Sequence, residues 1–169
     1  MERFKEFEKS AVLLERAVAL KPDDLGLRKQ LFGLLVAQGR LNDALTQIHG
    51  DTNYPEIRKL LIDAYLRAGD FAKAEAQARA LVTAEPTDRN AIRLLADILS
   101  WDGKYTESLK LFHDLAMNDP RDPELPVRIA EVTLWSGDQV AATGLFESLL
   151  AKRFDQPTLW EGYVDAASG

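Results

Sequence analysis

The sequence contains no cysteine among its 169 residues and only two histidines, His49 and His113. The absence of cysteine excludes disulfides, thiolate metal sites and cysteine nucleophiles. Neither histidine belongs to a His-x-x-x-His or Glu-x-x-His pair, the spacing that holds a metal ion on a helix. No glycine-rich phosphate loop is present, because Gly144 stands alone in a helical pattern. We therefore expect no enzymatic activity, no cofactor and no metal.

Basic net charge and long apolar runs are also missing. The net charge is −6 at pH 7, whereas a general nucleic-acid binder needs a basic face, so no nucleic-acid partner is expected. No stretch approaches the ~18 apolar residues of a membrane span, and the charged N-terminus lacks the apolar core of a signal peptide. The apolar content of 46% is typical of a soluble folded protein. A cysteine-free chain suits the cytosol and the periplasm equally, so the compartment is left open.

An internal period is the most informative feature that is present. Four glycines in similar surroundings are spaced 30, 34 and 34 residues apart, each between two apolar helical stretches. A glycine there supplies the positive φ that lets a helix end and the chain turn back. These glycines are Gly39, Gly69, Gly103 and Gly137.

The same step of 34 residues relates several other positions. A small side chain recurs where two helices are expected to approach closely, and proline recurs at the ends of repeats. The apolar series are Leu61, Leu95, Ile129 and Tyr163; Ala64, Ile98, Val132 and Ala166; and Leu81, Leu115 and Leu149. The small series is Ala74, Ser108 and Ala142, and the prolines are Pro22, Pro86 and Pro120.

This register resembles the tetratricopeptide repeat family, whose unit is helix A, glycine turn, helix B and proline. The family's A helix carries a large residue, a Leu-Gly/Ala pair and a tyrosine, which Trp160, Leu95-Ala96, Ile129-Ala130 and Tyr65 match. The resemblance implies an all-α fold, a right-handed α-solenoid of antiparallel helical hairpins. It also implies a non-catalytic scaffold that binds a partner protein or peptide on the concave face of the A helices.

The register divides the chain into about four repeats with a half-repeat at each end. We expect a lone B helix at 1–22, a short repeat at 23–54, full repeats at 55–88, 89–122 and 123–156, and a lone A helix at 157–169. Because solenoids normally end in polar capping helices, we interpret the chain as part of a longer array; the alternative is that both half-repeats are true caps. The short repeat predicts a helix over 41–48 and then turn formers at 49–55, which form a hinge, an extra binding edge or a tolerated deletion. Asp88 and Asp122 are expected to cap the helices that follow them.

The resemblance places the candidate binding residues on the inner face of the A helices. One position is acidic in four successive repeats: Asp63, Asp97, Glu131 and Asp165. We expect Lys59 and Arg93, four residues before the first two acids, to neutralise them in part. Glu131 and Asp165 have no such partner, so the C-terminal half of the groove should attract a basic or apolar peptide. The predicted partner-binding residues are Lys59, Asp63, Arg67, Arg93, Asp97, Trp101, Glu131, Leu134, Trp135 and Asp165.

Two tryptophans allow two interpretations. Trp101 and Trp135 either pack under the following repeat or face the groove, where tryptophan is a frequent hot spot. The family's clamp for a C-terminal carboxylate needs Asn at the positions of Asp63 and Asp97, so binding of chaperone C-termini is not expected.

Two alternatives to a peptide scaffold remain. The Trp-x-Gly turns also resemble tetratricopeptide scaffolds of bacterial exopolysaccharide secretion, which slightly favours the periplasm and a polysaccharide, stacked on Trp101 and Trp135, as the partner. The other alternative is self-association through apolar helix faces near Trp160 and Tyr163 at an open end.

Overall fold

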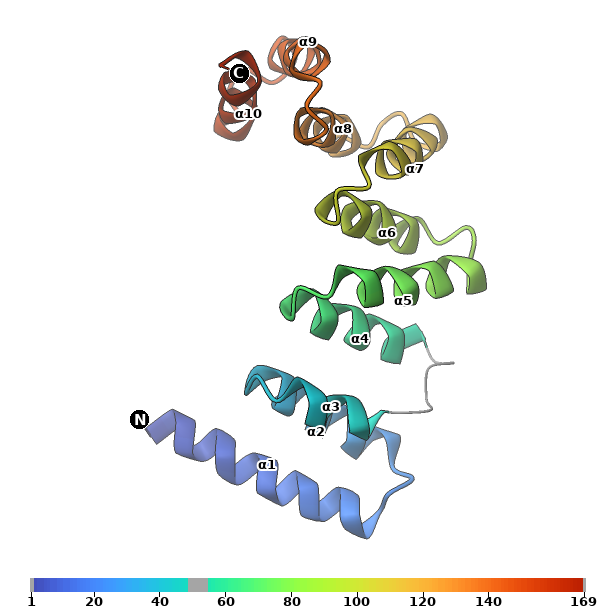
Figure 1. Ribbon diagram of the computed structural model, residues 1–169, viewed down its shortest axis with the longest axis vertical. Helices are drawn as coiled ribbons and strands as arrows, with labels where there is room; N and C mark the ends of the chain where they lie inside the picture. The colour runs from blue at the N-terminus through green and yellow to red at the C-terminus, as the bar shows by residue number, and fades with distance from the viewer. Residues whose placement is uncertain (1, 49–54, 169) are drawn as a thin grey trace. The chain divides into compact units, whose positions relative to one another are not determined.

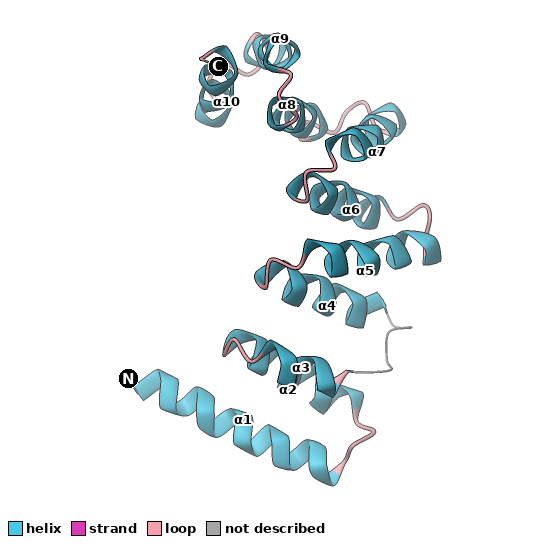
Figure 2. Cartoon of the chain, viewed as in Figure 1, coloured by secondary structure: helices cyan, strands magenta, loops and turns pink. Residues whose placement is uncertain are grey.

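The computed structural model describes residues 2–48 and 55–168, and all regular structure within these ranges is α-helical (Figures 1 and 2). Of the predicted turn segment at 49–55, residues 49–54 lie outside the described residues, and Pro55 is the first residue of α4. The helices are α1 (Glu2–Leu20), α2 (Leu25–Ala37), α3 (Leu41–Gln47), α4 (Pro55–Arg67), α5 (Phe71–Ala84), α6 (Arg89–Trp101), α7 (Tyr105–Asn118), α8 (Leu125–Trp135), α9 (Gln139–Leu150) and α10 (Pro157–Ala167). The predicted all-α class is therefore confirmed.

The first of two compact units covers Met1–Gln77. Helix α2 packs on α3, and its residues Leu31, Phe32 and Leu35 form a buried cluster with Ile57 and Leu61 of α4. Helix α3 has only 7 residues, as the short repeat predicted, because turn-forming residues follow it directly.

The second unit covers Ala78–Gly169 and contains the hairpins α6–α7 and α8–α9, followed by α10. One buried cluster joins Phe112 of α7 to Ile129 and Val132 of α8. A second joins Phe146 of α9 to Leu159 of α10. Leu115, Ile129 and Leu149 of the 34-residue series are members of these cores, so equivalent positions of successive repeats are buried in the same way.

The four repeat glycines have the left-handed backbone that the sequence predicted, with φ between 71° and 90°. At Gly103 the turn is closed by two backbone bonds, from Gly103 N to Ser100 O (3.2 Å) and from Lys104 N to Leu99 O (2.8 Å). This pair of bonds satisfies carbonyl groups that a helix end otherwise leaves open. Each hairpin therefore turns within three residues.

The predicted small positions lie where the two helices of a hairpin meet. Ala74, Ser108 and Ala142 are completely buried. Ser108 is the polar member, and its hydroxyl donates to the Ala96 carbonyl oxygen at 2.7 Å, so α7 is bonded to α6 as well as packed on it. A buried hydroxyl without such a partner would destabilise the fold.

One helix start differs from the prediction. Asp88 caps α6 as expected, accepting from Asn90 N and Ala91 N. The prediction that Asp122 caps the next helix is wrong, because α8 begins three residues later, at Leu125. Asp122 accepts from Glu124 N at 3.0 Å, a turn bond that precedes the helix, and its other oxygen binds Arg93.

Candidate functional site

The first unit carries three of the predicted binding residues on α4. Lys59, Asp63 and Arg67 are all exposed. Asp63 binds Arg67 Nε at 2.8 Å, so the predicted pairing of Asp63 with Lys59 is wrong. An acid four residues before a base is the favoured order along a helix, which explains the choice.

The other seven residues lie in the second unit. Arg93, Asp97 and Trp101 are on α6; Glu131, Leu134 and Trp135 are on α8; and Asp165 is on α10. We call this set the A-helix surface of the second unit.

Arg93 does not pair with Asp97 as predicted. Its guanidinium binds Asp122 and, at 2.7 Å, Glu124, both in the segment that leads into α8. The pairing therefore links α6 to the next hairpin rather than neutralising an acid on its own helix.

Asp97 and Glu131 share a cation that sequence reasoning missed. Arg128 of α8 donates to Asp97 Oδ1 from Nε (3.0 Å) and Nη2 (2.5 Å), and to Glu131 Oε2 from Nη1 (2.5 Å). The prediction that Glu131 lacks a basic partner is therefore wrong. The signal was present in the 34-residue series, where Arg128 replaces the leucines at Leu60 and Leu94.

The Arg128 guanidinium also lies against two aromatic rings. Its carbon atom is 5.7 Å from the centroid of Phe112 and 5.4 Å from that of Trp135, within the range of a cation–π contact. Burial alone would lower the pKa of Arg128, but the carboxylates of Asp97 and Glu131 outweigh it, so the pKa is raised. Arg128 therefore carries a permanent positive charge that binds carboxylates of α6 and α8 and lies over the ring of Trp135.

Neither tryptophan is a core residue. Trp101 is 46% exposed and Trp135 is 43% exposed, whereas Leu95 and Ile129 of the same helices are buried. Each ring ends an A helix directly before a glycine turn. Both rings therefore lie at the surface of the protein, and their place in the groove stays a prediction.

A hollow opens beside the arginine. It measures about 590 Å³ and is lined by Val127 and Arg128 of α8, Pro123 and Glu124 before it, and Arg153 and Gln156 before α10. The hollow gives a peptide room next to the charged groups.

Among the described residues, no cluster of three or more His, Asp or Glu side chains is placed to hold a metal ion. None of the described helices has the length and apolar content of a membrane-crossing helix.

The Arg93–Asp122 pair predicts a pH dependence of stability. Burial raises the pKa of Asp122, but the backbone N–H of Glu124 and the Arg93 guanidinium lower it more, so the net shift is downward. A carboxyl with a lowered folded pKa stabilises the fold above its unfolded pKa of about 3.9 and loses that contribution as pH falls through the folded pKa. Asp122→Asn should therefore be less stable than wild type in urea unfolding at pH 7, with a gap that narrows below about pH 4. A gap that is constant with pH would contradict this assignment.

Comparison with known proteins places the fold. The family model described as "Tetratricopeptide repeat" matches residues 55–98. No curated protein sequence matches the chain.

Solved structures match over most of the chain at low identity. A tetratricopeptide repeat protein from Parabacteroides merdae is 18% identical, with a TM-score of 0.79 over 97% of this chain and 67% of that one. YrrB, described as a TPR protein with an unusual peptide-binding site, is 12% identical, with a TM-score of 0.70 over 95% and 84%. MamA from Desulfovibrio magneticus is 17% identical, with a TM-score of 0.69 over 92% and 90%. The chain therefore carries tetratricopeptide repeat sequence at residues 55–98 within a tetratricopeptide-type helical fold, in agreement with the resemblance that its 34-residue register shows.

Proposed function

We propose that this protein is a non-catalytic scaffold that binds a partner peptide or protein on the A-helix surface of its second unit. The observation that carries the proposal is the exposure of Trp101 and Trp135 at the ends of two successive A helices. Exposed tryptophan beside charged groups is characteristic of interaction hot spots. YrrB, a similar fold, has a peptide-binding site by its description.

The charges on this surface favour a basic or apolar peptide. Arg93 and Arg128 contact four carboxylates between them. Two cations against four anions leave a charge of −2, the exposed Asp165 adds one negative charge, and Arg153 in the lining of the hollow offsets it, so the local charge is −2. Because the acids are held by arginines, a bound peptide would meet an ordered acidic surface rather than mobile side chains, which lowers the entropic cost of binding.

Peptide selection from a random phage library on the immobilised chain tests the proposal. Selected peptides should be apolar or basic, and Trp135→Ala should weaken their binding on the order of tenfold, because it removes the ring that they cover. Glu131→Lys should weaken the binding of basic peptides further, and added salt should also weaken it. Binding is measured by fluorescence anisotropy.

Trp160→Ala is the matched control, because Trp160 is also partly exposed (39%) but lies on α10, where its indole N–H donates to the Phe154 carbonyl. Its effect on peptide binding should be small. If the selected peptides bind Trp101→Ala and Trp135→Ala with unchanged affinity, the proposal is contradicted. A polysaccharide could bind instead. If its binding did not depend on salt and was lost in Trp135→Ala, this would support the exopolysaccharide alternative and its periplasmic location. Concentration-dependent self-association lost in Trp160→Ala would favour an oligomerisation module.

A further inference from the structure

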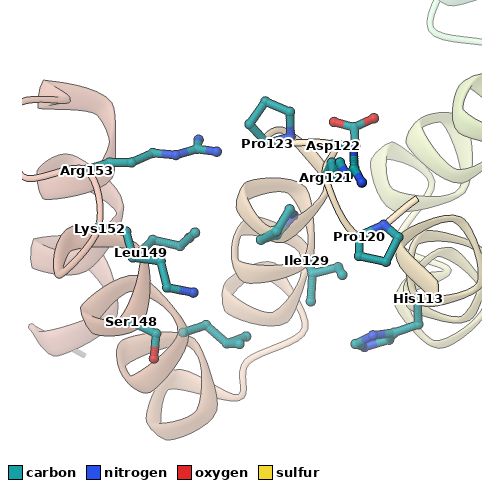
Figure 3. A pocket seen from close by; sticks show the side chains of 12 residues that line it. His113, Pro120, Arg121, Asp122, Pro123, Ile129, Ser148, Leu149, Lys152 and Arg153 are labelled. Carbon is teal, nitrogen blue, oxygen red and sulfur yellow. The ribbon is translucent and has the colours of Figure 1, made fainter. Parts of the chain in front are cut away.

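A second hollow lies against the face of α8 that points away from Arg128, and it shares Pro123 and Arg153 with the first hollow. Its volume is about 380 Å³, and it is enclosed by α7, α8, α9 and the loops that follow α7 and α9 (Figure 3). We call it the B-helix pocket, because two B helices form its walls. Pro126 and Ile129 of α8 line it, whereas Arg128 binds Glu131 of the A-helix surface. Residues three apart share a helix face, and these two pairs point to opposite faces.

The interior of the B-helix pocket is apolar. Ile129 and Leu149 are almost fully buried beneath it. Pro120 and Pro123 line one side of the pocket (Figure 3), and proline is rigid and has no backbone N–H that needs a partner. The volume falls within the roughly 300–1,000 Å³ of ligand pockets. The pocket can therefore take an apolar side chain with little rearrangement.

The rim of the B-helix pocket is basic, on a protein whose net charge is −6. Arg121, Lys152 and Arg153 supply three cations, and within the described part of the chain none of their side chains forms an ion pair. Asp122 is the single carboxylate of the lining, and Arg93, which is not part of the lining, already binds it. The local balance is therefore +2 or more, the reverse of the A-helix surface.

The positions of the cations suit a ligand that crosses the pocket. Arg153 extends from the end of α9 toward Pro123, and Lys152 lies beside it (Figure 3). The His113 ring points into the pocket from α7 on the other side. An apolar group that enters between Ile129 and the prolines would have Lys152 and Arg153 on one flank and the His113 ring on the other.

From this arrangement we propose that the B-helix pocket binds an acidic peptide segment that carries one apolar side chain. The apolar side chain fills the space above Ile129 and Leu149, and the flanking carboxylates pair with Arg121, Lys152 and Arg153. The chain then has two binding surfaces of opposite charge preference within one unit, which meet at Pro123 and Arg153.

A fluorescein-labelled pentapeptide, with Phe at its centre and two Glu on each side, serves as the probe. Fluorescence anisotropy should show saturable binding that weakens with added salt. The same peptide with Lys in place of Glu, or with Ser in place of Phe, should bind on the order of tenfold more weakly, because each loses one of the two complementary interactions. No binding of the acidic peptide at millimolar concentration would overturn the proposal.

Variants locate the site. Lys152→Glu should weaken binding on the order of tenfold. Lys110→Glu, an exposed lysine of α7 outside the lining, makes the same change in net charge and should have little effect. Ser148→Phe, at an exposed wall position, should block the pocket, with folding checked by circular dichroism. Equal losses in Lys152→Glu and Lys110→Glu would show only a general charge effect and would overturn the proposal.

Two further controls test whether the A-helix surface contributes to this binding and whether phosphate is the true ligand of the pocket. Trp135→Ala should leave binding of the acidic peptide unchanged, so this result is independent of the proposed function of the A-helix surface. Inorganic phosphate should release the peptide no better than chloride of equal ionic strength. Release by phosphate alone would assign the pocket to phosphate-bearing ligands and overturn the peptide proposal.

Discussion

Gly162→Ala is expected to destabilise the second unit by about 1–3 kcal/mol, although alanine normally favours a helix over glycine. A Cβ atom at Gly162 would lie 2.5 Å from two ring carbons of Phe146. Phe146 is 1% exposed and packed between α9 and α10, so its ring cannot move aside without disturbing the core. Either α10 shifts away from α9 or the ring leaves its position. Urea-induced unfolding followed by circular dichroism measures the change.

Gly144→Ala is the matched control on the neighbouring helix α9. A Cβ atom there meets nothing within 4 Å, so the substitution should stabilise by up to about 1 kcal/mol through helix propensity. The two glycine substitutions should therefore have opposite signs. Phe146→Leu removes the ring that the new Cβ atom would meet. In this background Gly162→Ala should lower the free energy of unfolding by less than it does in the wild-type protein. A stabilising Gly162→Ala would mean that the close approach of α9 and α10 is not needed.

The features that sequence predicted correctly depend on local backbone geometry or on the period. A glycine between two helical stretches must adopt positive φ to close the turn, so Gly103 and its equivalents were identifiable without a structure. Ser108 was identified as a point of close approach because its series contains only small residues. The shortness of α3 followed from the turn formers behind it. In each case the deciding information lies within a few residues or exactly one repeat away.

The ion pairs of the A-helix surface could not be predicted in the same way. The sequence analysis compared residues four apart on one helix, whereas Arg128 reaches Asp97 across 31 positions. Which arginine or lysine pairs with a given carboxylate depends on the distance between neighbouring A helices and on the direction of each side chain. The 34-residue series did mark Arg128 as a charge among leucines, but not its partners.

The B-helix pocket was not predicted from the sequence, for a different reason. The family resemblance directs attention to the A helices, and Lys152 and Arg153 follow a B helix. Arg121 occupies the equivalent loop one repeat earlier, so a basic cluster at the ends of B helices could have been recognised. The hollow itself arises from the packing of α7, α8 and α9 and has no local sequence signal.

Arg128→Met is expected to destabilise the second unit by about 1–3 kcal/mol, the penalty of leaving partly buried charged groups without their hydrogen bonds. Methionine keeps the apolar stem of the side chain but removes the guanidinium. Asp97 is only 21% exposed on its side chain, so its carboxylate would be left in a poorly solvated position. Trp135 would also lose the cation on its ring, and its fluorescence should change.

Arg67→Met is the matched control, because it removes an arginine–aspartate pair whose side chains are 66% and 57% exposed. Exposed pairs contribute about 0.2–1 kcal/mol, so its effect on stability should be clearly smaller. Adding Asp97→Asn to Arg128→Met should restore part of the stability, because it removes the unpaired charge. If Asp97→Asn alone costs as much as Arg128→Met and the two effects simply add, the two groups are not coupled.

The same variant separates the two roles of Arg128, because it changes the charge of the A-helix surface without touching the B-helix pocket. With Arg128 removed, the local charge of this surface falls from −2 to −3, and a basic peptide should gain electrostatic attraction while losing an ordered site. If basic peptides bind Arg128→Met more tightly, charge dominates recognition and the arginine is there to hold α6 and α8 together. If they bind more weakly despite the more negative surface, the ordered position of Trp135 is what the partner requires.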